Sequence, residues 1–162
     1  MPKYIFGFLC LLFCLVSCNS KLEFSKYQTL QDGNWATDRA VYFEFSELDS
    51  VQPYNMFINV RNDNDFQFSN LFLITELEYP DGNTQKDTLE YVMAEPTGEW
   101  LGKGIGSVKE NKLWYKESVV FPDSGVYKVK VSHAMRKNGD VEGISVLEGI
   151  TDVGLEIEKT SE

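Results

Sequence analysis

Apolar and polar residues alternate at every second position in most of the chain beyond residue 40. Near the C-terminal third, for example, three apolar residues, Tyr127, Val129 and Val131, alternate with two lysines. Successive side chains of a β-strand point to opposite faces of a sheet, whereas an α-helix repeats every 3.6 residues. The pattern therefore predicts strands that bury one face and expose the other.

The same alternation recurs in several short segments separated by turn sequences. Residues 88–93 are ambiguous, because their apolar positions also suit a helix. No segment beyond residue 17 carries a long amphipathic helical pattern. Seven or eight short strands predict an all-β fold: an antiparallel two-sheet sandwich, either jelly-roll or immunoglobulin-like, with a closed barrel as the main alternative. The other strand segments are 40–45, 54–60, 71–79, 113–121 and 153–158, and the turns are Pro80–Asn83, Pro122–Gly125 and Asn138-Gly139.

The first 17 residues have the pattern of a secretion leader. Lys3 supplies a basic start, and the apolar run from Tyr4 to Val16 is too short to span a bilayer. The run ends in Leu-Val-Ser before Cys18, which resembles the bacterial lipobox. The resemblance implies that residues 1–17 are a helical signal peptide that is cleaved, and that Cys18 is acylated and anchors the mature chain to a membrane.

The cysteines agree with this interpretation. The chain has three, Cys10, Cys14 and Cys18, so two leave with the leader and the third carries lipid. We expect a mature domain without disulfides, held together by burial of its core. Several acyl chains on one cysteine would give stable anchoring.

The mature chain is short and acidic. Removal of the leader leaves 145 residues, which suits a single domain, with a formal net charge of −11. Such a surface repels nucleic acid and anionic headgroups, so neither is an expected ligand. We expect residues 18–34 to be a lipidated tether, with Leu22, Phe24 and Tyr27 able to dock, and residues 35–162 to be the sandwich domain.

Residues that could support catalysis or bind a metal ion are few. His133 is the only histidine, no nucleophile-elbow motif is present, and we expect it to be structural. One histidine and no free thiol disfavour zinc or copper. Asp63 and Asp65 lie in an Asn-Asp-Asn-Asp run that offers oxygen ligands, which makes them a weak calcium candidate. The run lacks the glycine and the distal glutamate of an EF-hand loop. We therefore expect its Asn and Asp side chains to cap turns, and we expect no cofactor.

The most distinctive segment is rich in glycine around a tryptophan. Trp100, Gly102, Gly104 and Gly106 form a candidate loop for a ligand or partner, in which backbone passes close to a large ring. It is no dinucleotide fingerprint, because no helix pattern follows it. The favoured interpretation is that Trp100 packs into the core, with an exposed aromatic platform as the alternative. Trp35 and Trp114 raise the same question with the same expectation.

Several stretches, taken in order, resemble the gliding-motility-associated lipoprotein family GldH of Bacteroidetes. The match runs from leader to C-terminus at similar spacing. It departs at His133, where Gln is expected, and in a longer stretch between Arg136 and Gly149. The matching stretches are the lipobox at Cys18, Trp35, Ser69–Leu73, Asp87–Glu90, Gly98–Gly106, Phe121-Pro122 with Gly125 and Tyr127, Ala134–Arg136, and Gly149–Lys159.

The resemblance implies a non-enzymatic accessory component of the gliding motility machinery, acting with other envelope lipoproteins. The residues after Cys18 lack the acidic cluster associated with export to the cell surface in that phylum, so we expect the outer membrane, facing the periplasm. Two alternatives remain open. One is a carbohydrate-binding sandwich that uses Trp100 or Trp114, with calcium at Asp63 and Asp65. The other is an envelope hydrolase that depends on His133.

Overall fold

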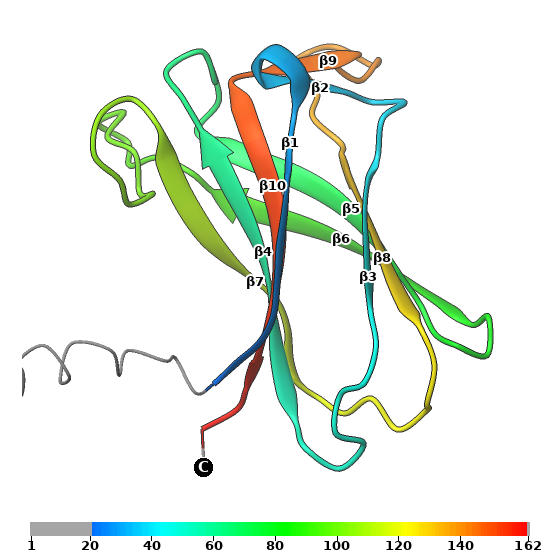
Figure 1. Ribbon diagram of the computed structural model, residues 1–162. Helices are drawn as coiled ribbons and strands as arrows, with labels where there is room; N and C mark the ends of the chain where they lie inside the picture. The colour runs from blue at the N-terminus through cyan, green and yellow to red at the C-terminus, as the bar shows by residue number, and fades with distance from the viewer. Residues whose placement is uncertain (1–20, 162) are drawn as a thin grey trace, which may run out of the picture.

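Ten strands make up most of the computed structural model, which describes residues 21–161 (Figure 1). A short 3-10 turn, η2 (Gln31–Gly33), follows the first strand. Within residues 21–161 no helix has the length and apolar character needed to cross a membrane. The strands are β1 (Leu22–Thr29), β2 (Asn34–Ala36), β3 (Val41–Phe45), β4 (Tyr54–Asn62), β5 (Asn70–Glu78), β6 (Thr84–Val92), β7 (Lys109–Val119), β8 (Tyr127–His133), β9 (Val146–Glu148) and β10 (Ile150–Lys159).

Strands from opposite ends of the chain pair with one another. β1 pairs with β10, β2 with β9, β3 with β8, β4 with β7, and β5 with β6, always antiparallel. The described chain is thus one long hairpin that turns between β5 and β6. The hairpin is rolled up, because β10 also pairs with β4, and β8 with β5.

The rolling produces two four-stranded sheets. Sheet 1 has the order β1-β10-β4-β7 and sheet 2 the order β3-β8-β5-β6, while β2 and β9 form a separate pair. The expected antiparallel two-sheet sandwich is confirmed. This strand order is that of a jelly roll, since an immunoglobulin-like sandwich distributes its strands differently between the sheets.

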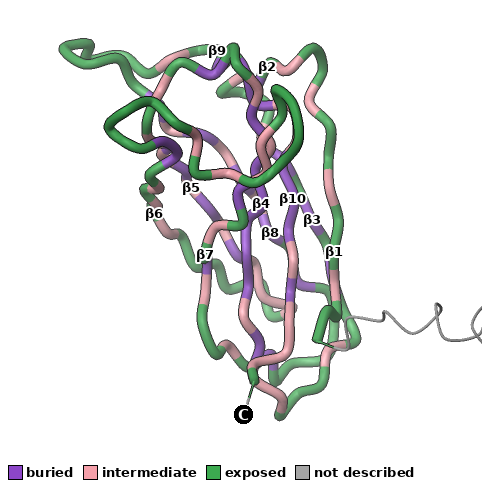
Figure 2. Tube along the Cα trace, turned by 90° about the vertical axis from the view of Figure 1, so that its left-hand side faces the viewer, coloured by how far each residue is buried: buried purple, intermediate pink, exposed green. Residues whose placement is uncertain are grey.

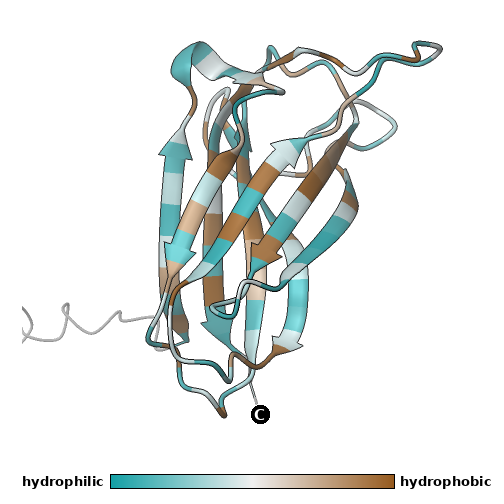
Figure 3. Cartoon of the chain, turned by 90° about the vertical axis from the view of Figure 1, so that its right-hand side faces the viewer, coloured by the Kyte–Doolittle hydropathy of each residue, from teal (hydrophilic) through white to brown (hydrophobic). Residues whose placement is uncertain are grey.

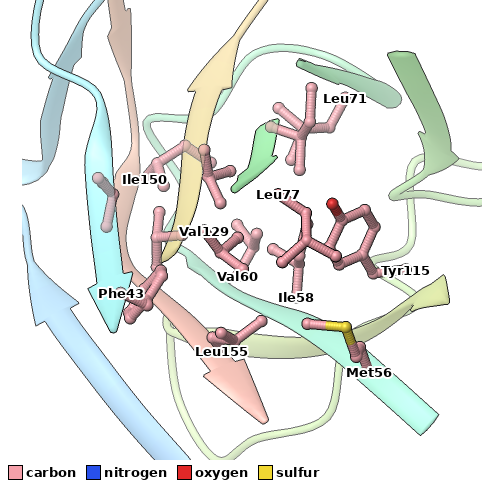
Figure 4. Close-up of a cluster of buried hydrophobic side chains, with 14 of the residues drawn as sticks. Phe43, Met56, Ile58, Val60, Leu71, Leu77, Tyr115, Val129, Ile150 and Leu155 are labelled. Atoms are coloured by element: carbon pink, nitrogen blue, oxygen red, sulfur yellow. The ribbon is translucent and has the colours of Figure 1, made fainter. Parts of the chain in front are cut away.

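The inner faces of the two sheets form one hydrophobic core. The predicted alternation holds in β3, where Val41, Phe43 and Phe45 are buried and Tyr42 and Glu44 are exposed. Alternating bands of apolar and polar residues run along the strands in Figure 3, and the buried positions line the inside of the sandwich in Figure 2. Figure 4 shows the core side chains that both sheets contribute, among them Phe43, Met56, Ile58, Val60, Leu71, Leu77, Val129 and Leu155.

Two of the predicted turns have the expected chemistry. The turn between β5 and β6 closes with the Tyr79 N–H donating to the Asn83 carbonyl at 2.8 Å, while the Asn83 N–H donates to Asp81 Oδ1 at 2.9 Å. Before β8, the Tyr127 hydroxyl donates to the Asp123 carbonyl at 2.9 Å. This bond resembles the tyrosine corner of other sandwiches, which fixes the chain where it changes sheet. The ambiguous segment 88–93 is mostly strand, as part of β6.

The predicted tether is too long. Residues 22–29 form β1, which pairs with β10 from Leu22 to Thr29, and Trp35 in β2 is completely buried. β1 is an edge strand with no fully buried side chain, so its sequence lacks a clear apolar face. The sheet pairing of β1 therefore had no strong signal in the sequence. The predicted signal peptide and Cys18 lie outside the described residues.

Candidate functional site

The sandwich has two different ends. At the end that we call basal, the two ends of the described chain meet: the Lys159 N–H donates to the Lys21 carbonyl at 2.8 Å, and the Thr160 N–H to the Pro53 carbonyl at 3.1 Å. At the opposite, apical end lie the β2–β9 pair and the loops that follow β4, β6 and β8 (Figure 1). β4 runs between the two ends with nine residues, which at about 3.3 Å per residue is about 30 Å.

The glycine-rich loop lies at the apical end, and part of it packs against the core. Trp100 is half-buried, with its ring 5.9 Å from that of Phe66 in the loop after β4. Gly102 lies beside Asn111 of β7, and Lys109 Nζ donates to the Gly104 carbonyl at 2.9 Å. Gly106 has open space around it. The loop is therefore held at its sides and open at its tip.

The other two tryptophans differ from each other. Trp35 is completely buried, as expected, and its ring lies 5.5 Å from that of His133. Trp114 is 53% exposed, so the expectation that it packs into the core is wrong. Its neighbours Leu113 and Tyr115 face the interior of the sandwich, which turns Trp114 outward onto Phe57 at 4.5 Å between ring centroids.

The calcium candidates cap a turn. Asp63 Oδ1 accepts the N–H of Asp65 at 2.9 Å, which is the local bond expected of aspartate in a turn. The segment packs closely against the loop between β9 and β10, where a Cβ on Gly149 would lie 1.9 Å from the Phe66 nitrogen. Residues 21–161 contain no group of three or more His, Cys, Asp or Glu side chains placed to hold a metal ion.

His133 is buried, and its hydrogen bonds disfavour a role as a base. Nδ1 accepts the Met135 N–H at 3.4 Å, so the ring proton of the neutral form lies on Nε2. Nε2 points at Thr37 Oγ1, 3.5 Å away, and the Thr37 hydroxyl itself donates to the Ile144 carbonyl at 2.7 Å. Burial lowers the pKa of His133, which keeps the ring neutral. In this arrangement Nε2 faces a hydroxyl that already donates to a carbonyl, which disfavours proton transfer from Thr37 to the ring.

The outer face of sheet 1 carries a network of paired charges, which we call the closed network. Arg61 Nε lies 2.7 Å from Glu110 Oε2, and its guanidinium stacks over the Tyr27 ring at 4.5 Å. The Tyr27 hydroxyl lies 3.2 Å from both Glu110 Oε1 and Glu156 Oε1. Burial, and then the charges of the two glutamates, raise the pKa of Tyr27.

Lys112 extends the closed network across the same face. Its Nζ lies 2.9 Å from Glu156 and 2.8 Å from Glu158, and 4.4 Å from the centroid of the Phe57 ring. Burial tends to raise the pKa of Glu156, but its hydrogen bonds, the one to Lys112 foremost, lower the pKa overall. Beneath these side chains Asn59 is completely buried, although it belongs to the outer face of β4.

Sheet 2 has a groove of about 630 Å³ at its apical end, which we call the basic groove. Residues from three distant parts of the sequence line it. Two of the segments that carry the family resemblance, 69–73 and 134–136, meet here. No sequence pattern predicts this groove, because only the rolled hairpin brings its segments together. Its main side chains are Phe68, Phe72, Val92, Met135, Arg136 and Lys137.

Comparisons with known proteins give a consistent result. A family model described as GldH lipoprotein matches residues 23–157. The chain is 54% identical over 157 residues to a gliding motility lipoprotein GldH homolog of Christiangramia forsetii, covering 97% of this chain and 94% of that protein. It is 46% identical over 145 residues to gliding motility lipoprotein GldH of Flavobacterium johnsoniae, covering 90% and 89%.

Among solved structures, the chain is similar to VP2 in the subviral particle of infectious bursal disease virus. The TM-score is 0.37 at 14% identity, and the match covers 87% of this chain and 34% of the viral chain. A likeness this low carries no argument about function.

Proposed function

The chain belongs to the GldH lipoprotein family, and from this premise we propose that it is a lipid-anchored, non-enzymatic component of the gliding machinery that works by binding other envelope proteins. Family membership over residues 23–157 carries the proposal. The curated relatives are named gliding motility lipoproteins and match nearly their whole length.

The geometry of the two ends supports attachment through Cys18. Lys21 lies at the basal end, three residues after Cys18, and three residues reach at most about 10 Å. An acylated Cys18 would therefore hold the basal end at the bilayer and direct the apical loops away from it. We place the anchor in the outer membrane, on the periplasmic side.

The state of the titratable groups supports a binding role. The buried histidine donates from Nε2, and Glu110, Glu156 and Glu158 are engaged with Arg61 or Lys112. A catalytic acid or base has to be free to exchange a proton with a substrate. We infer that these groups stabilise the domain and that the function lies in surface recognition.

Deletion of the gene in a gliding host tests this proposal. We expect loss of colony spreading, with recovery when the full chain is returned and no recovery with a Cys18→Ala chain. The Cys18→Ala chain should also move from the membrane fraction to the soluble fraction. Normal spreading after deletion would refute a role in motility, and a membrane-bound Cys18→Ala chain would refute the anchor.

The exposed Trp114 favours a second candidate function, carbohydrate binding. Its ring stands on the outer face of sheet 1 beside Phe57, and aromatic platforms of this kind can stack on sugars. Trp100 is less suited, because Phe66 packs against it. Glycan-array binding that is lost in Trp114→Ala and kept in Trp100→Ala would support this candidate, while a silent array would remove it.

A further inference from the structure

The basic groove differs in charge from the rest of the molecule. The chain carries a net charge of −10, yet no aspartate or glutamate from residues 21–161 lines this groove. Arg136 and Lys137 are exposed there, and neither makes an ion pair or a side-chain hydrogen bond with any residue from 21 to 161. In the described part of the chain, carboxylates lie only at the edges of the groove, where Glu90 accepts a hydrogen bond from the Asn70 amide and where Lys137 also borders a neighbouring pocket that contains Asp65 and Asp140. Two exposed cations that no side chain of residues 21–161 pairs with are a feature that an anionic partner can recognise.

The other cations on the outer face of sheet 2 are already engaged in ion pairs. Lys86 and Lys130 both pair with Glu76, at 3.2 and 3.3 Å, and Lys128 pairs with Glu78 at 3.0 Å. These pairs follow the strand register, which sets glutamates of β5 opposite lysines of β6 and β8. Arg136 and Lys137 come after the last residue of β8 and so have no partner of this kind.

Apolar side chains lie in the groove beside the two cations. Val92, at the end of β6, is 65% exposed. Met135 is buried, and its sulfur accepts the N–H of Phe72 at 3.2 Å, which fixes that part of the groove to β5. Phe72 is half-buried against the core. A surface that combines exposed apolar groups with unpaired charges is typical of recognition sites.

We propose that the basic groove binds an extended segment of a partner protein that carries carboxylates next to apolar side chains. Arg136 and Lys137 would contact the carboxylates, since a guanidinium binds a carboxylate through two parallel hydrogen bonds. Val92 and Phe72 would contact the apolar side chains. The identification of the partner as an envelope protein rests on the proposed function.

The position of the groove disfavours an anionic lipid of the chain's own membrane as the occupant. The groove lies at the apical end, where β5 begins and β6 and β8 end, while Lys21 lies at the basal end about 30 Å away, a length set by the nine residues of β4. A bilayer that holds the chain at Cys18 therefore lies on the far side of the domain.

Photo-crosslinking in the native envelope tests the proposal. The full-length lipoprotein, with p-benzoyl-phenylalanine in place of Val92, is irradiated in its own cells, and the adduct is mapped by mass spectrometry. We expect an adduct with a partner segment that contains carboxylates and apolar residues. The double variant Arg136→Glu with Lys137→Glu should lower the adduct yield by about tenfold. Lys26→Glu, a charge reversal at another exposed lysine that makes no ion pair within residues 21–161, should leave the yield unchanged.

Several outcomes would overturn the proposal. They are an adduct to a second copy of this chain, an adduct to lipid, a partner segment without carboxylates, a yield that charge reversal does not change, and no adduct at Val92. The proposed function fails separately, if gene deletion leaves spreading normal. The two proposals can also be separated in one strain. If deletion abolishes spreading, but the charge-reversed chain restores gliding and still forms the adduct, the proposed function stands and the role of the basic groove in binding is refuted.

Discussion

The outer faces of the two sheets use their charged residues in different ways. On sheet 1, Arg61 and Lys112 are paired with glutamates, and their side chains lie over the rings of Tyr27 and Phe57. At the apical end of sheet 2, Arg136 and Lys137 line a groove and pair with no other side chain of the described residues. The first arrangement completes its interactions within the fold, and the second leaves interactions to be made with another molecule.

This difference separates stability from recognition. Hydrogen bonds to charged groups contribute to folding when both partners are held in place, and removal of one partner leaves the other poorly solvated. A charge that pairs with nothing in the fold contributes little to folding, so a substitution there changes binding alone. The contrast therefore predicts opposite effects for variants of the closed network and of the basic groove.

The largest effect is expected from Tyr27→Ala. This change removes the ring beneath the Arg61 guanidinium and the hydroxyl between Glu110 and Glu156. We expect a loss of about 2–3 kcal/mol in the free energy of unfolding, measured by urea denaturation of the detergent-solubilised lipoprotein.

Tyr42→Ala is the matched control for this prediction. Tyr42 lies on the outer face of sheet 2, also in an edge strand, and is 57% exposed. Its removal should cost less than about 1 kcal/mol. Equal losses for the two variants would mean that the closed network adds no stability.

A smaller effect, which depends on pH, is expected from Glu156→Gln. The pKa of Glu156 is lowered in the folded chain, so its contribution to stability is complete above the usual glutamate pKa of about 4.5 and disappears as the pH falls through the folded value. At pH 7 we expect the variant to be less stable by about 1 kcal/mol. The difference should vanish on acidification well below pH 4. A difference that persists unchanged at low pH would assign the effect to packing and not to charge.

The smallest effect on stability is expected from the charge reversal in the basic groove. Arg136→Glu with Lys137→Glu should change the free energy of unfolding by less than about 0.5 kcal/mol, because neither side chain has a partner within residues 21–161. Thermal unfolding followed by circular dichroism would measure this. A marked loss of stability would show that these cations support the fold, and the contrast between the two faces would no longer hold.

The core strands could be predicted because each buries one face. Val41, Phe43 and Phe45 alternate with exposed residues, and the same holds for β8 and the end of β10. β1 escaped prediction as a strand because an edge strand without a buried face leaves no such pattern. Trp114 was wrongly expected in the core because its neighbours Leu113 and Tyr115 are also apolar or aromatic. Where both alternating sets of side chains in a strand are apolar, the alternation does not show which set faces the core.

The surfaces could not be predicted, because they depend on which strands lie side by side. Asn59 alternates with apolar residues and lies on the outer face of β4, yet it is buried by side chains from β1, β7 and β10 that the sequence does not bring together. Likewise, Phe72, Val92 and Arg136 meet only after the hairpin has rolled up. The prediction of Trp100 and its glycines as a candidate partner loop remains a prediction.

Cysteine accessibility in the intact envelope tests the central claim most directly. The chain has no cysteine beyond Cys18, so a cysteine introduced by Val92→Cys would be the only free thiol of an acylated mature chain. Its labelling by a maleimide reagent should be slow in native membranes and fast once detergent has separated the partner, while Tyr42→Cys should be labelled at the same rate in both. Equal rates for Val92→Cys before and after extraction would show that the groove is empty in the envelope and would contradict the account.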